Sequence, residues 1–194
     1  MNTVMNKKNS TLVLSALLLI IAAAFTRLFP HYPNFTAIGA IAVFGGAVIK
    51  DKKLALLLPL GTLLLSDICL QLFTSTRGFY GTSQYFVYAA FLIITALATF
   101  MQKRSIANIA LAAIWSGVIF FIISNLGVWF SSDYYPKNLI GLGACYWASI
   151  PFYKNELFGN FLLNSIMGNL FFLAVLFGAY YALTGSRKMQ KAIA

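Results

Sequence analysis

Charged side chains are scarce in this chain, and their scarcity is the first guide to its class. Only 9% of the 194 residues are charged, and four of those are acidic. An ordinary soluble domain carries about 25% charged residues. Hydrophobic residues make up 60% of the chain, and the mean hydropathy is +0.82. This balance excludes an ordinary soluble domain and predicts an integral membrane protein.

The residue types on which most enzymes and metal sites depend are also few. His31 is the single histidine, and we interpret it as a solvated loop residue. Cys69 and Cys145 do not have the C-x-x-C spacing of a metal site. The sequence contains no H-E-x-x-H or G-x-x-x-x-G-K-[ST] motif and no serine, histidine and acid arrangement. We therefore expect no enzymatic activity and no resident cofactor, and an enzyme acting on lipid is only a third possibility.

Long apolar runs dominate what remains. Most reach the ~20 residues that cross a ~30 Å hydrocarbon core at about 1.5 Å per residue, although the first two are shorter. They are continuous instead of alternating, which favours helices over barrel strands. We therefore predict an all-α integral membrane protein, one domain over residues 1–194, with six transmembrane helices. The predicted spans are 11–25, 34–49, 54–73, 83–101, 105–124 and 157–183.

The basic residues predict how these spans are oriented. Ten of the 14 Lys and Arg residues lie in alternate gaps between the runs, and short loops rich in Lys and Arg mark the cytoplasmic side. Both termini are therefore expected to be cytoplasmic, in a multi-pass protein of a bacterial cytoplasmic membrane. The ten residues are Lys7, Lys8, Lys50, Lys52, Lys53, Lys103, Arg104, Arg187, Lys188 and Lys191. Membrane topology alone therefore explains the net charge of +10, and we expect no binding of nucleic acid. The expected consequence of the charge is attraction to the anionic surface of the lipid bilayer.

The outer side is expected to hold a short helix and many aromatic rings. Residues 137–150, before Pro151, are apolar but too few to span, so they predict a helix packed on the outer face. Two explanations of the aromatic residues stay open, an interfacial belt and an outward-facing pocket. They are Tyr32, Phe35, Phe79, Tyr80, Tyr85, Trp129, Phe130, Tyr134, Tyr135, Tyr146, Trp147, Phe152 and Tyr153.

Asp67 is the only acidic residue inside a predicted span. A carboxylate within the membrane is costly and is by default a functional hypothesis. Two structural roles are also open, a cap on its helix or an ion pair with Arg77. Asn34, Asn125 and Asn160 are predicted to lie at the same outer rim, which favours convergence on one site.

Four segments together resemble a known family. They are 27–36 (RLFPHYPNFT), 65–67 (LSD), 124–129 (SNLGVW) and 141–152. The chain is similar over nearly its whole length to an uncharacterised bacterial family of predicted membrane transport proteins. That family looks like the substrate-binding S components of energy-coupling factor (ECF) vitamin transporters.

The resemblance implies a six-helix S-component fold with a small-molecule site beneath the outer loops. Two positions depart from the family pattern, since Ala37 replaces a proline and Asn160 replaces an aspartate. The substrate-binding residues expected on this basis are Asn34, Phe35, Asp67, Asn125, Trp129, Tyr135, Tyr146 and Asn160.

The resemblance also bears on partners and on the cysteines. S components dock an energising ECF module through an Ala-xxx-Ala face on the first helix. Here Ile20 follows Ala16 at that spacing, so a solitary transporter stays open. Solitary S components that move cobalamin bind its cobalt through an outer-side cysteine, a role that Cys69 would fill. A disulfide between Cys69 and Cys145 also stays open, as do two unrelated buried thiols.

The sequence thus predicts membrane uptake of a vitamin-like small molecule, with cobalamin as one candidate. The alternative is a membrane scaffold or assembly factor that does not transport and that binds a protein partner at its outer face.

Overall fold

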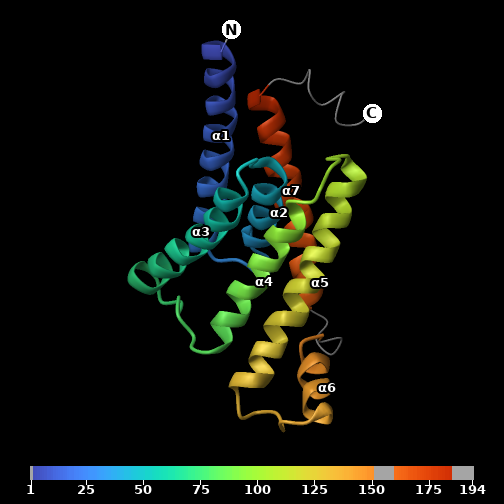
Figure 1. The fold of residues 1–194 in the computed structure, drawn as a ribbon. Coiled ribbons are helices and arrows are strands. Elements are labelled where there is room, and N and C mark those ends of the chain that lie inside the picture. The colour runs from blue at the N-terminus through green and yellow to red at the C-terminus, as the bar shows by residue number, and fades with distance from the viewer. Residues whose placement is uncertain (1, 151–159, 185–194) are drawn as a thin grey trace.

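The computed structural model describes residues 2–150 and 160–184, with side chains from residue 13 onward (Figure 1). Within these residues the chain forms seven α-helices and one 3₁₀ turn, and no strand. The all-α fold predicted from the continuous apolar runs is confirmed. In chain order the elements are α1 (Asn2–Phe25), η1 (Thr26–Leu28), α2 (Ile38–Val48), α3 (Lys52–Phe73), α4 (Ser83–Ala98), α5 (Ile106–Ser131), α6 (Leu139–Ala148) and α7 (Phe161–Thr184).

Three of these helices, α3, α5 and α7, are long and apolar enough to cross a membrane. The described part of α1 with η1 is an apolar stretch of 10–17 residues, as are α2, α4 and α6. The described residues therefore have the character of a multi-pass membrane protein. The count of six spans stays a prediction.

The helix boundaries differ in places from those of the predicted spans. α2 begins at Ile38 rather than at residue 34, because Asn34 has a left-handed φ of 63° that does not continue a right-handed helix. α5 continues past residue 124 to Ser131. α6 lies within the predicted 137–150, and residues 157–159 of the last predicted span lie outside the described residues.

Short polar side chains set the start of four helices. Oδ1 of Asp51 accepts hydrogen bonds from the amides of Lys53 and Leu54 at 2.9 and 3.1 Å. These bonds satisfy two donors that have no partner within the helix. The four caps are Asp51 for α3, Ser105 for α5, Asn138 for α6 and Asn160 for α7.

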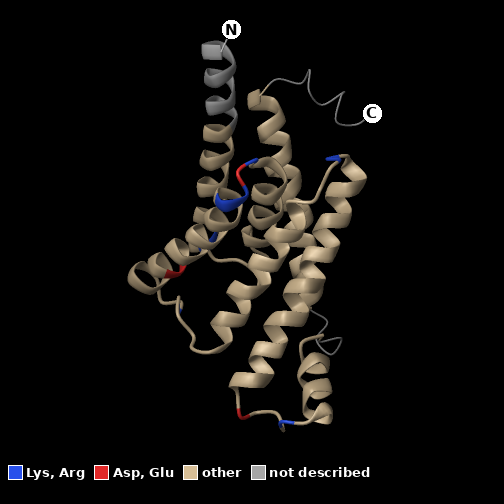
Figure 2. Cartoon of the chain, viewed as in Figure 1, with Lys and Arg blue, Asp and Glu red and all other residues tan. Residues whose placement is uncertain are grey.

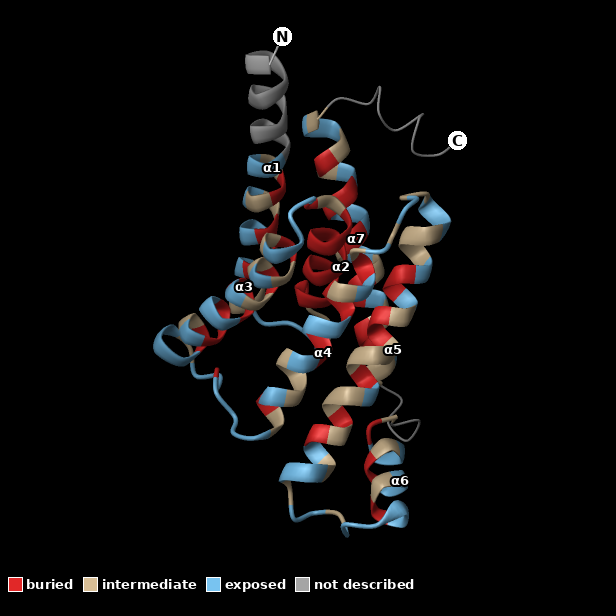
Figure 3. Ribbon diagram, viewed as in Figure 1, coloured by how far each residue is buried: buried red, intermediate tan, exposed pale blue. Residues whose placement is uncertain are grey.

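α2 is the centre of the bundle. Every residue from Ile38 to Ala47 is buried, and α1, α3, α4, α5 and α7 all contact this helix. Figure 3 shows its buried ribbon enclosed by helices that are exposed on their outer faces. Small residues permit the close approach, since a Cβ at Gly46 would lie 2.6 Å from the backbone oxygen of Thr95 on α4.

The two ends of the bundle differ in the segments that they hold. In Figure 1, α1 starts and α7 ends toward the same end of the molecule, and the α2–α3 and α4–α5 connections lie in that half. These connections carry Lys50 and Asp51, and Lys103 and Arg104 (Figure 2). The α5–α6 connection lies at the opposite end, beside α6. This arrangement is the one that the alternating charge pattern favours.

The packing of α2 leads to a test with two matched substitutions. Gly46→Ala should lower the thermal stability, since its Cβ would overlap Thr95 and overpacking costs about 1–3 kcal/mol. Gly61→Ala on α3 places its Cβ in open space, so the gain in helix propensity of about 1 kcal/mol should leave stability equal or higher. Thermal unfolding of both variants in detergent measures the difference. Equal melting temperatures would contradict the close α2–α4 contact.

Candidate functional site

Asp67 lies in the last third of α3 and is fully buried, with 0% of its surface exposed. A buried carboxylate without compensation costs several kcal/mol, so its neighbours decide whether the position is tolerated. Partners reach it from three other parts of the chain, namely η1, the α3–α4 connection and α4. This network is the most elaborate polar arrangement among the described helices, and it defines the candidate site.

Arg27 supplies the positive charge. It lies in η1, directly after α1, and its Nη1 donates hydrogen bonds to Oδ1 of Asp67 and, at 2.7 Å, to Oγ of Ser66. An ion pair with Arg77 was one of the two structural roles that the sequence left open for Asp67, and in the structure the partner is Arg27 instead. The sequence signal that could have pointed to Arg27 is its place directly after the first apolar run. In the structure α1 packs against α3, which brings Arg27 to Asp67.

Two side chains of α4 complete the shell around Asp67. Nε2 of Gln84 donates to Oδ2 at 3.0 Å, and the Tyr88 hydroxyl donates to the same oxygen at 2.7 Å. Gln84 and Tyr88 are four residues apart, so they lie on one face of the helix. Sequence analysis missed both residues. Their i, i+4 spacing near the start of an otherwise apolar helix was the signal that could have found them.

The connection between α3 and α4 closes over this network. Gly78 packs so tightly on the backbone of Asp67 that a Cβ at Gly78 would overlap the Asp67 carbonyl oxygen. Its amide donates to Oε1 of Gln71 at 3.2 Å, and its carbonyl accepts from Nε2 of Gln84 at 3.3 Å. The amide of Tyr80 donates to Oε1 of Gln84 at 3.3 Å. Gln84 therefore joins the connection to the carboxylate.

Tyr80 is one of two ionisable residues in this connection, the other being Arg77. Burial raises the pKa of its phenol to about 12, and the negative charge of Asp67 adds to the increase. The phenol therefore stays protonated to a more alkaline pH than an ordinary tyrosine does.

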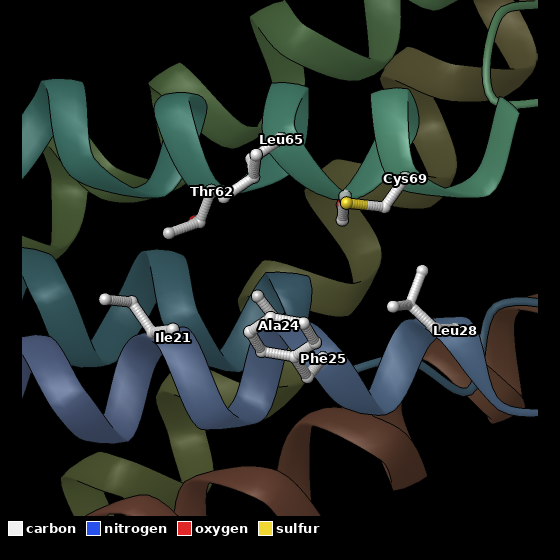
Figure 4. A pocket seen from close by; sticks show the side chains of 8 residues that line it. Ile21, Ala24, Phe25, Leu28, Thr62, Leu65 and Cys69 are labelled. Atoms are coloured by element: carbon white, nitrogen blue, oxygen red, sulfur yellow. The ribbon is translucent and has the colours of Figure 1, made fainter. Parts of the chain in front are cut away.

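An apolar groove lies beside the ion pair, between α1 and α3 (Figure 4). Its enclosed space is about 20 Å³, and the whole hollow measures about 300 Å³ when the open space at its side is included. The view shows the α1 side chains facing those of α3 across the groove. Ser66 belongs to the groove lining and also accepts the hydrogen bond of Arg27, so the groove adjoins the charged pair. The lining residues are Ile21, Ala24, Phe25, Leu28, Thr62, Leu65, Ser66 and Cys69.

The two cysteines are free and lie in different surroundings. Cys69 is half-buried in the groove lining, whereas Cys145 on α6 is buried and its Sγ lies 3.5 Å from the carbonyl oxygen of Asn125. The disulfide between them is therefore not formed in this structure. Burial raises the pKa of the Cys145 thiol and disfavours its thiolate. The described residues contain no group of three or more His, Cys, Asp or Glu that could hold a metal ion. A single cobalt–thiolate bond at Cys69 stays a prediction.

A second set of predicted residues fastens α6 to α5. Oδ1 of Asn125 accepts a hydrogen bond from the Ser149 hydroxyl, and the Tyr146 hydroxyl donates to the carbonyl of Ile122 at 2.7 Å. Nε1 of Trp129 donates to the carbonyl of Pro136 at 2.9 Å. These bonds explain how the short helix is held.

The third set connects the residues just before α2 with α7. Nδ2 of Asn34 lies 3.5 Å from the carbonyl oxygen of Phe161, and Asn160 caps α7 by accepting from the amide of Leu163 at 2.9 Å. The Phe35 ring packs on those of Phe171 and Phe172. The remaining predicted residue, Tyr135, is half-buried in the α5–α6 connection, and His31 is exposed, as expected.

The predicted site residues thus belong to three different sets of contacts. Asp67 has the buried charge network, Asn125, Trp129 and Tyr146 hold α6, and Asn34, Phe35 and Asn160 lie around the start of α7. Only the Asp67 set adjoins the groove between α1 and α3.

The chain belongs to a family of unknown function, DUF6580, whose model matches residues 6–192. No curated protein and no solved structure matches it.

The buried ion pair leads to a double-mutant prediction. Asp67→Asn and Arg27→Gln should each lower the free energy of unfolding by about 3–5 kcal/mol, because each leaves the other charge without its partner in an apolar bundle. The double variant should lose less than the sum of the two, and the exposed Asp133→Asn is the matched control. Equilibrium unfolding in mixed micelles measures the four values. Additive losses would contradict a direct pair.

Proposed function

We propose that this protein takes up a vitamin-like small molecule through a binding site that opens on the outer side of a bacterial cytoplasmic membrane. In this proposal the chain crosses the membrane six times, with both termini in the cytoplasm, in the manner of an ECF S component. The observation that carries it is the buried Arg27–Asp67 pair beside an apolar groove.

Burying a charged pair between helices costs desolvation free energy that can exceed the attraction between the charges. Apolar side chains of similar volume stabilise a buried position at least as well as an ion pair does in many proteins. The network also needs four further donors and acceptors, from Ser66, Gly78, Gln84 and Tyr88. Ionisable residues within membrane spans mark substrate or ion pathways, which supports a functional role for this one.

The groove offers a ligand little enclosed room. Ligand pockets commonly have volumes of about 300–1,000 Å³, with apolar walls and a few polar groups that fix orientation. The enclosed space of the groove, about 20 Å³, is far below this range, so a ligand would lie at its open side or require α1 and α3 to move apart; its polar groups are Thr62, Ser66 and Cys69. Cobalamin is much larger than a drug-sized ligand, so binding it at Cys69 would require the groove to widen.

The scaffold function is favoured by a different surface. α6 exposes Leu139, Ile140 and Trp147, with 85%, 82% and 65% of their surfaces accessible. An exposed apolar patch of this kind is typical of protein or membrane contacts. A protein partner bound there would make this chain an assembly factor.

One preparation separates these functions. The protein, purified gently in lipid nanodiscs, should yield a copurifying small molecule by native mass spectrometry, and Asp67→Asn should lose it. Asp133→Asn is the control that should retain it. A copurifying ATPase would identify an energising ECF module. A stoichiometric polypeptide at α6 without any small molecule would overturn the uptake proposal in favour of the scaffold.

The same preparation tests cobalamin. If Cys69 binds cobalt, added cobalamin should change its visible spectrum, because a thiolate is a soft ligand for a transition metal. Cys69→Ser should abolish the change and Cys145→Ser should not. An unchanged spectrum and no measurable binding with reduced wild-type protein would exclude cobalt binding at Cys69 and leave the uptake proposal in place.

A further inference from the structure

Five basic side chains lie in or directly beside the α2–α3 and α4–α5 connections, in one half of the bundle (Figure 2). Asp51 is the one acidic residue of these two connections. Five positive charges and one negative charge leave this region with a formal charge of +4. We call the five residues the basic cluster, and they are Lys50, Lys52, Lys53, Lys103 and Arg104.

The charges of the basic cluster are not neutralised within the described part of the protein. Oδ1 of Asp51 accepts hydrogen bonds from the backbone amides of Lys53 and Leu54, so this carboxylate caps α3. None of the five basic side chains forms an ion pair with another described residue. The four lysines are exposed, and the buried Nε of Arg104 has no hydrogen-bond partner there. The cluster can therefore attract an anion from outside the chain.

The two connections form one surface. The ammonium group of Lys52 lies over the ring of Phe100, 5.5 Å from the ring centroid. Such a contact between a cation and an aromatic face is attractive. It brings a charge from the start of α3 to the α4–α5 connection, although the two residues are far apart along the chain. Phe100 keeps 71% of its surface exposed, so the ring remains open to a ligand.

Exposed apolar side chains lie beside the charges. Phe100 and Ile106 come shortly before and after Lys103 and Arg104 in the chain, and they are 71% and 79% exposed. Ile106 is also the first residue of α5, which is long and apolar enough to span a membrane. Cations at the start of a span, with apolar surface next to them, match a phospholipid, whose phosphate lies at the membrane surface above its acyl chains. Basic clusters beside transmembrane helices are typical sites for anionic lipid head groups.

We propose that the surface formed by the α2–α3 and α4–α5 connections binds an anionic phospholipid, with its phosphate on the basic cluster and an acyl chain along Phe100. This site is more specific than the general attraction of basic residues to a bilayer, because it has a defined place and selects lipids by net charge. The inference goes beyond the proposed uptake function and does not depend on it.

The test compares phosphatidylglycerol with phosphatidylethanolamine of identical acyl chains. Both lipids contain a phosphate, but only phosphatidylglycerol has a net negative charge. The full chain in detergent micelles is titrated with each lipid, and native mass spectrometry counts the lipids that stay bound. The first phosphatidylglycerol should bind about tenfold more tightly than the first phosphatidylethanolamine. The double variant Lys52→Gln, Lys103→Gln should lose this preference, whereas Arg77→Gln, which removes an exposed cation from the α3–α4 connection, should retain it.

Two further comparisons separate the lipid from other anions. Phe100→Ala should weaken phosphatidylglycerol binding without a change in charge, and Phe73→Ala, at an exposed phenylalanine at the end of α3, should not. Glycerol 3-phosphate has the phosphate without acyl chains and should not displace the lipid at millimolar concentration. The substituted side chains are exposed, so the melting temperatures of the variants should equal that of the wild type.

Four results would overturn the proposal. Equal affinities for the two lipids, or a preference that the double lysine variant keeps, would show that the basic cluster does not select an anionic lipid. Tight binding of glycerol 3-phosphate would identify a site for a soluble phosphate. An acidic polypeptide that copurifies with the wild type and is lost from the lysine variant, without any lipid preference, would identify a protein surface.

Discussion

The constraint on which the rest of the structure depends is the burial of one carboxylate in an apolar bundle. Asp67 is fully buried on α3, so the chain must bring charge and hydrogen-bond donors to it. Arg27 holds the end of α1 to Asp67, and Gln84 and Tyr88 hold the start of α4 to it. Gly78 lets the α3–α4 connection pack directly on the backbone of Asp67. One side chain thus fixes how three helices meet at one level of the bundle.

The same constraint generates the candidate site. Nη1 of Arg27 donates to Asp67 and to Ser66, which holds the guanidinium in place. Ser66 also lines the apolar groove between α1 and α3. The groove and the charge network therefore meet at one residue of α3.

Sequence reasoning predicted the helices well and their contacts less well. Continuous apolar runs predicted an all-α protein, and the residues after 137 predicted a short helix, which is α6. The start of α2 was missed because the continuous apolar run does not reveal the left-handed conformation of Asn34, which has a φ of 63°. Asp67 was singled out by its charge alone, but its partner Arg27 is 40 residues away along the chain, and pairing over that separation is set by helix packing. The polar residues Gln84 and Tyr88 have no signal beyond their spacing.

Hydrogen–deuterium exchange tests most directly whether Asp67 organises this end of the bundle. The amides of Gly78 and Tyr80 are held by the side chains of Gln71 and Gln84, and Gln84 is held by Asp67. In nanodiscs, Asp67→Asn should therefore speed exchange in two segments together, 26–29 and 74–82, while the α5–α6 connection over 132–138 is unchanged. Faster exchange in neither segment, or in 74–82 alone, would contradict the account.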